Sequence, residues 1–181
     1  MRLLAFPALV SAMALILAVA PDARADEPGG TRIALDLDYG LAIDERDIDN
    51  GGGGALRMGF ELDAIAVSLT PELSFGYQSF AGDFGPRLYR GTAGLRLSFL
   101  KVIEPGVFAH AGVGRASFDR SNGLADPSRT AFTWDAGLTL DFTLLPVFEF
   151  GAHGAYNSLA AGDAPESLNW TTFGLHATLA L

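Results

Sequence analysis

The residues best suited to chemistry lie near the carboxyl end of the chain. Glu149 and His153 are four residues apart, and His176 follows on a later segment. A histidine oriented by a carboxylate is the base of a Ser/His hydrolase, which also needs a serine within hydrogen-bond reach of the imidazole. The position two after His153 is Ala155, and Ser158, the nearest serine in sequence, falls at a predicted loop. Because the nucleophile is missing, we expect no catalytic site and no enzymatic activity.

Two neighbouring motifs also suggest ligands. Residues 44–50 read DERDIDN, in which carboxylates alternate as in a cation-binding loop, but the sixth-position Gly and terminal Glu of an EF-hand are missing. Residues 51–54 are four glycines with no lysine after them and no predicted helix, so a phosphate site is not indicated. We interpret both as parts of one solvated, flexible connection and expect no metal and no cofactor.

Composition excludes several classes of protein. The 181 residues carry a net charge of -9, and 49% are hydrophobic while 18% are charged, which is too apolar for a disordered chain. Lys101 is the single lysine, so no basic stripe for nucleic acid is present. With no cysteine, disulfide scaffolds and thiolate metal sites are excluded.

Residues 1–25 have the pattern of a secretory signal peptide. Arg2 precedes an apolar stretch from Leu3 to Ala20, and residues 23–25 read Ala-Arg-Ala, a small-x-small cleavage site. We therefore expect residues 1–25 to be removed and residues 26–181 to form the mature domain. After residue 25 no apolar run is long enough for a helical membrane span.

The mature chain instead alternates apolar and polar residues. From Thr31 to Ile43 the odd positions are apolar and most even ones polar or small, which is the period of a half-buried strand. The same period recurs along the chain. The apolar face is least clear near residues 106–118. We predict eight strands near residues 31–43, 54–63, 65–79, 87–100, 106–118, 130–142, 147–157 and 169–181.

The connections between these strands alternate in length. Short turns fall near residues 63–65, 102–105 and 143–146, whereas longer connections span residues 44–53, 80–86, 119–129 and 158–168. An even number of tilted strands with short turns at one end and long loops at the other is typical of outer-membrane barrels. The pattern predicts an all-β fold, an eight-stranded antiparallel up-and-down transmembrane β-barrel.

Alternation alone does not decide which face points outward, but the aromatic residues help. Six lie on the apolar faces toward the loop ends, and three toward the turn ends: Tyr39, Tyr77, Tyr89, Phe132, Trp134 and Tyr156, then Phe99, Phe142 and Phe148. Two such girdles mark the two membrane interfaces. A secreted, soluble lipocalin-like barrel, with its apolar faces inward, is the competing interpretation.

The chain resembles the small eight-stranded outer-membrane barrels of the OmpA/OmpX type. The resemblance covers residues 31–181 and rests on segments such as PELSFGY at 71–77, GLR at 94–96, GVG at 112–114 and GLHA at 174–177. It implies an integral outer-membrane location and contact with outer-membrane lipid, lipopolysaccharide and the assembly machinery. Because some barrels of this kind modify lipid A, a lipid A-modifying enzyme is a further alternative.

An eight-stranded barrel has a lumen that side chains fill, so charges on the polar faces should pair there. The predicted structural network comprises Arg32, Asp36, Arg57, Glu61, Glu72, Arg90, Arg96, Asp135, Glu149, His153 and His176. We therefore expect a monomeric outer-membrane barrel without an open pore, with a structural or surface-interaction role and no nucleic-acid partner. Arg115, if it points outward at the loop rim, could meet lipopolysaccharide phosphates.

Overall fold

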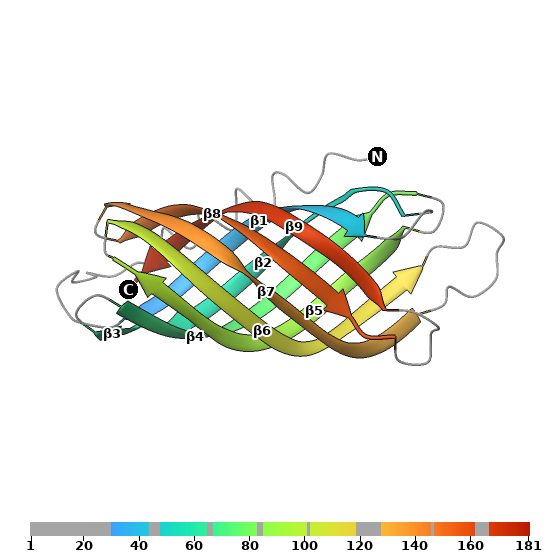
Figure 1. The fold of residues 1–181 in the computed structure, drawn as a ribbon, viewed down its shortest axis with the longest axis horizontal. Coiled ribbons are helices and arrows are strands. Elements are labelled where there is room, and N and C mark those ends of the chain that lie inside the picture. Colours follow the sequence, from blue (N-terminus) through green and yellow to red (C-terminus); the bar gives the residue numbers. More distant parts are fainter. Residues whose placement is uncertain are drawn as a thin grey trace.

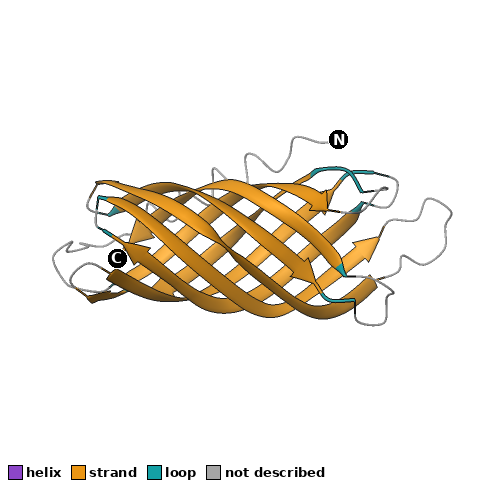
Figure 2. Ribbon diagram, viewed as in Figure 1, coloured by secondary structure: helices purple, strands orange, loops and turns teal. Residues whose placement is uncertain are grey.

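The structure, a computed structural model, is a barrel of antiparallel strands (Figures 1 and 2). It describes residues 30–43, 48–64, 67–82, 85–100, 102–118, 128–145, 147–161 and 167–181. The predicted signal peptide, residues 1–25, and most of the acidic motif, residues 44–47, lie outside the described residues. Within the described ranges no helix is long and apolar enough to cross a membrane.

Nine strand segments in the described ranges make up the barrel wall. They are β1 (Thr31–Ile43), β2 (Gly51–Phe60), β3 (Leu62–Ala64), β4 (Val67–Phe80), β5 (Pro86–Phe99), β6 (Ile103–Phe118), β7 (Ser128–Leu145), β8 (Phe148–Leu159) and β9 (Leu168–Ala180). β2 and β3 pair with β4 in one continuous register on either side of Glu61, and so form a single barrel strand. The predicted eight-stranded up-and-down barrel is therefore confirmed.

The sheet closes where the first and last strands meet. β1 pairs with β9 from Arg32, opposite Ala180, to Ile43, opposite Asn169. Beyond that ladder the backbone N–H of Thr31 donates to the carbonyl of Leu181 at 3.0 Å, and the Leu181 N–H donates back at 2.9 Å. Closure gives every strand two hydrogen-bonded neighbours, which is what a sheet surrounded by lipid requires.

The glycine run does not lie in a loop, and the interpretation of residues 51–54 as a flexible connection is wrong. Gly51 to Gly54 form the first part of β2, with Gly54 opposite Leu37 on β1 and Gly51 opposite Phe80 on β4. Glycine is a poor strand former, but a partner strand on each side supplies the ladder hydrogen bonds that hold the segment. A side chain at Gly53 would collide with the β4 backbone at Tyr77 and Gln78. The strand is therefore glycine-rich where the barrel wall is tightly packed.

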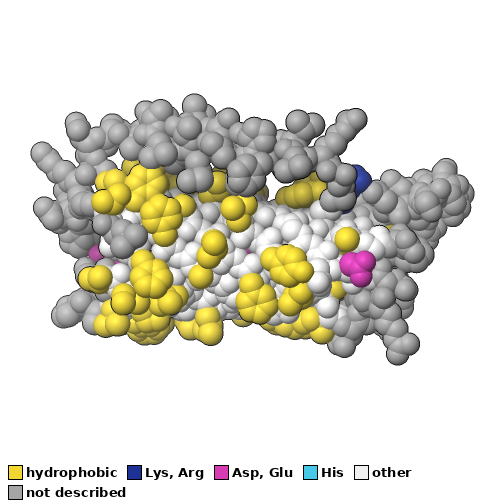
Figure 3. All heavy atoms as spheres, turned by 90° about the horizontal axis from the view of Figure 1, so that it is seen from above, with side chains coloured by type: hydrophobic (Ala, Val, Ile, Leu, Met, Phe, Trp, Pro, Cys, Tyr) yellow, Lys and Arg dark blue, Asp and Glu magenta, His cyan; other side chains and the backbone are white. Residues whose placement is uncertain are grey.

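The apolar faces of the strands point outward. Leu73, Phe75 and Leu138 are more than half exposed, whereas Arg96 and Asp141 are almost fully buried. Figure 3 shows hydrophobic side chains spread over the outer wall and few charged ones on the visible face. This is the reverse of a lipocalin-like barrel and the arrangement expected in lipid.

The segment whose faces were hardest to predict, β6, follows the same rule. Val107 and Val113 are exposed on the outer wall, and His110 is buried inside. Arg115 is exposed on the outer face near the loop end. Its strand runs from residue 103 to 118, three residues longer than predicted at the turn end.

Outward aromatic residues pair across neighbouring strands. Tyr77 and Tyr89 lie with ring centroids 5.0 Å apart, and Trp134 and Tyr156 lie 5.5 Å apart, all four toward the loop end. Phe148 and Phe150 stack at 6.2 Å at the turn end of β8. Such rings are suited to the two membrane interfaces because they combine apolar area with polarisable or hydroxyl groups.

The assignment of faces predicts opposite behaviour for two adjacent residues of β7. Leu138 is 66% exposed and Thr139 is buried in the lumen. We expect Leu138→Arg to reduce the free energy of folding into lipid by about 2 to 4 kcal/mol, because a guanidinium near the midplane is costly there. The effect of Thr139→Arg should instead depend on crowding among the lumen side chains. Folding titrations in lipid vesicles measure both, and a neutral Leu138→Arg would mean that the faces are inverted.

Candidate functional site

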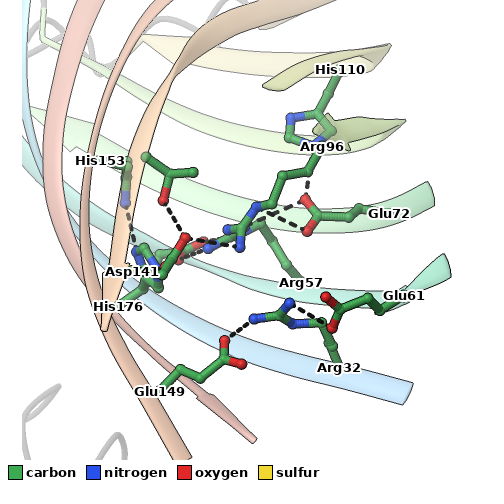
Figure 4. Close-up of polar contacts among 12 residues, drawn as sticks. Arg32, Arg57, Glu61, Glu72, Arg96, His110, Asp141, Glu149, His153 and His176 are labelled. Atoms are coloured by element: carbon green, nitrogen blue, oxygen red, sulfur yellow. Dashed lines mark hydrogen bonds and ion pairs between the residues drawn. The ribbon is translucent and has the colours of Figure 1, made fainter. Parts of the chain in front are cut away.

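The polar side chains inside the barrel form a connected network that begins at the turn end. Arg32 on β1 donates to Glu61 at 2.7 Å and forms an ion pair with Glu149 on β8. Thr143 on β7 donates to Glu104 on β6 at 3.0 Å. Arg32 thus links the residue between β2 and β3 to β8, on the far side of β9, as Figure 4 shows for Arg32, Glu61 and Glu149.

Two arginines organise the middle of the lumen. Arg57 forms a bidentate pair with Asp36, at 2.8 Å for both bonds, and reaches Glu72 at 3.4 Å. Arg96 lies between Glu72 and Asp141, 3.4 Å from each. Planar guanidinium groups suit such shared contacts, because their donors point at several carboxylates at once.

All three histidines of the chain lie in the lumen and are hydrogen-bonded to carboxylates. His110 Nδ1 lies 2.7 Å from Asp135, and its Nε2 lies 3.2 Å from Glu72. His153 Nε2 lies 2.8 Å from Asp38, and His176 Nε2 bonds to Asp141. The Nδ1 atoms of His153 and His176 face each other at 3.3 Å.

An apolar cluster covers the polar network at the loop end. Its buried members come from five strands and point inward: Phe80, Leu88, Ala116, Leu159, Leu168 and Trp170. Trp170 donates its indole N–H to Gln78 at 2.9 Å, and the Arg90 guanidinium lies 5.0 Å from the Trp170 ring centre. We call these six residues the apolar plug, since they fill the lumen between the ion pairs and the loops.

Each residue of the predicted network points into the lumen and contacts another polar side chain there. Arg90, for example, donates to Asn157 at 2.8 Å and lies 3.3 Å from Asp135. Asp38 and Asp141 also take part in the network, and the structure adds two titratable members that sequence reasoning missed, Glu104 and His110. The alternation of β7 and β1 already places Asp141 and Asp38 on the polar face. His110 was obscured because apolar residues occupy both faces of β6.

The chemistry available to these groups is acid–base and metal chemistry. In the described part of the chain, the side-chain partners of the histidine nitrogens are carboxylates or another histidine, and no serine hydroxyl bonds to them. A Ser/His nucleophile pair is therefore not formed among the residues described. Asp36, His153 and His176 offer ligand atoms within 4.8 Å of one another.

The closed eight-stranded sheet, its apolar exterior and its filled polar lumen together make the fold of a small outer-membrane barrel. Solved structures with this fold include Neisserial surface protein A, with a TM-score of 0.64, 15% identity and coverage of 86% of this chain and 100% of that one. Ail of Yersinia pestis, solved with the heparin analogue sucrose octasulfate, has a TM-score of 0.60, 19% identity and coverage of 86% and 100%.

The outer membrane enzyme PagL is also similar, with a TM-score of 0.52, 17% identity and coverage of 82% of this chain and 99% of that one. No protein-family model matches the chain, and no curated protein matches it in sequence. At these identities the similarity establishes the fold.

The network predicts that its central arginine contributes strongly to stability. Arg57→Met leaves Asp36 and Glu72 buried without their shared partner. We therefore expect the free energy of unfolding to fall by about 3 to 5 kcal/mol. Chemical denaturation of the barrel folded in lipid measures this change. The double variant Arg57→Met, Asp36→Leu should recover part of the loss, because the unpaired carboxylate is also removed.

Arg115→Met is the matched control, because Arg115 is exposed on the outer face. Arg115→Met should lower the free energy of unfolding by less than about 1 kcal/mol. If Arg57→Met and Arg115→Met destabilise the barrel equally, the lumen ion pairs do not hold it together.

Proposed function

We propose that the chain is an integral outer-membrane β-barrel with a sealed lumen and a structural or surface-interaction role. The observation that carries this proposal is the combination of an exposed apolar wall with a polar interior. A wall of this kind is stable only when lipid covers it, and the likeness to solved outer-membrane barrels supports the outer membrane as the location. Export requires the signal peptide at residues 1–25, which we propose is cleaved.

The contents of the lumen support the absence of an open pore. Ion-paired side chains fill the lumen at the turn end and in the middle, and the apolar plug lies toward the loop end. Water-filled diffusion channels need about 16 strands, whereas eight leave room for side chains only.

The outer rim supports contact with lipopolysaccharide. Arg115 is exposed near the loop end and lies 3.3 Å from the Ser128 hydroxyl, which leaves other guanidinium donors available. Arginine forms strong paired contacts with phosphate oxygens. We propose outer-membrane lipid and lipopolysaccharide as partners, with the assembly machinery during insertion, and a monomer as the functional unit.

Fractionation of expressing cells tests the location. The protein should sediment with outer membranes, and its intact mass should correspond to a chain beginning at Asp26. Unboiled and boiled samples should migrate differently on an SDS gel, because closed strand pairing resists detergent until heated. Recovery of the protein in the soluble periplasmic fraction would contradict the location. A mass that includes residues 1–25 would contradict cleavage. Stable conductance in a planar bilayer would contradict the sealed lumen.

We propose that the barrel does not modify lipid A, although one similar structure is an enzyme. The proposal is supported by the positions of His110, His153 and His176, which face the lumen and not the lipid. Mass spectrometry of lipid A from expressing cells should match that of cells without the protein. An acyl chain that is lost or added with the wild type, but not with His153→Ala, would show that the lumen histidines do chemistry.

A further inference from the structure

We propose that His153 and His176 form a metal site inside the barrel, which binds a divalent transition metal of the zinc type with Asp36 as the third ligand. The three residues come from the neighbouring strands β8, β9 and β1, and Asp36 lies directly opposite His176 in the ladder. Figure 4 shows His153 and His176 side by side near Asp141. Neutral imidazole nitrogen and carboxylate oxygen are donors that Zn²⁺ accepts.

The hydrogen bonds of each histidine leave one nitrogen free for a metal. An ionised carboxylate can only accept a hydrogen bond, so Asp38 keeps the proton of His153 on Nε2, and Asp141 keeps that of His176 on Nε2. In the neutral ring the lone pair is then on Nδ1. A carboxylate that orients the far nitrogen of a ligating histidine is the usual outer partner in protein metal sites.

The distance between the free nitrogens suits a single bound ion. The two Nδ1 atoms lie 3.3 Å apart, and the ring centroids are 5.5 Å apart. Two nitrogens bound tetrahedrally at the usual Zn–N length are separated by about 3.4 Å. Two neutral imidazoles with these tautomers would otherwise point lone pairs at each other. A metal ion between them, or a proton shared by them, resolves this contact.

Two glycines make room for the rings. Gly174 lies opposite His153, and a side chain there would collide with the His153 ring and the Asp38 carboxylate. Gly151 lies opposite His176, where a side chain would collide with the His176 ring and Asp141. Each histidine with its carboxylate therefore lies over a strand position that has no side chain, which leaves room for the ring, while the hydrogen bond to the carboxylate orients it.

Charge and space around the cluster also favour a cation. Among the described residues the lumen buries six carboxylates but three arginines: Asp36, Glu72, Glu104, Asp135, Asp141 and Glu149 against Arg32, Arg57 and Arg96. Both oxygens of Asp36 accept hydrogen bonds from Arg57, so the metal would share this carboxylate with the guanidinium. A cavity of about 40 Å³ beside Asp36 and His153 has room for a water molecule as a further ligand, and Arg57 and Arg90 also line it. Because the apolar plug covers the loop end, metal is best supplied during refolding.

The test uses the full mature chain without a histidine tag, refolded in detergent with ZnSO₄ and then passed over a chelating resin. Elemental analysis should find about one zinc per barrel, and the unfolding temperature should rise with the free Zn²⁺ concentration. The His153→Gln and His176→Gln variants should each retain less zinc than the wild type, by about tenfold or more. Asp38→Asn should weaken zinc binding by roughly 10 to 100-fold. His110→Gln is the matched control, since His110 shares the lumen but not the cluster, and it should bind zinc like the wild type.

Heat-dependent migration on a gel shows which variants have folded. If either cluster variant does not fold, ¹⁵N spectra of the wild-type histidines replace it. Addition of zinc during refolding should then shift two Nδ1 signals and leave the third histidine unchanged. A wild-type barrel that retains no zinc, or that retains as much after His153→Gln or His176→Gln, would overturn the proposal and leave a shared proton between the rings.

Discussion

The interior of an eight-stranded barrel is about as wide as the side chains that line it, and this constraint governs the rest of the molecule. Since the outer face meets lipid, the polar half of each strand has to turn inward, and charged groups are brought together away from bulk water. Such groups are stable only when each finds a partner. Arg57, held by Asp36 and Glu72, and Arg96, between Glu72 and Asp141, meet this requirement with side chains from five different strands.

The sequence predicts the features of this structure that depend on the two-residue period of a strand and on which positions carry charge. Alternation identified eight strands and their polar faces because a strand has a period of two, and one buried face makes a slip in register costly. It placed Arg32, Asp36 and Glu149 inside, and closure of the barrel predicts that Glu149 lies near the arginines of the first strands, without fixing the individual pairs. Contacts between strands far apart in the chain depend on the stagger of the closed barrel, which local patterns do not encode.

The errors have physical causes as well. The glycines at 51–54 were expected in a loop because their intrinsic strand propensity is low, but β1 and β4 impose the strand from both sides. The apolar plug was missed because Leu88, Leu159 and Trp170 lie inside a barrel whose interior is otherwise polar. The facing nitrogens of His153 and His176 depend on side-chain rotamers and on two glycines of neighbouring strands, and a sequence pattern carries no such information.

The pairing of β1 with β9 has a consequence for how the molecule is made. Thr31 and Leu181 are joined by two hydrogen bonds although almost the whole barrel sequence separates them. Such distant contacts form late, because the long chain between them must first be ordered. Until β9 is present, β1 and β8 expose unpaired backbone groups that can join to strands of other chains. The period after export and before closure is therefore when this protein is most exposed to aggregation, and a chain truncated before residue 168 would remain in that state.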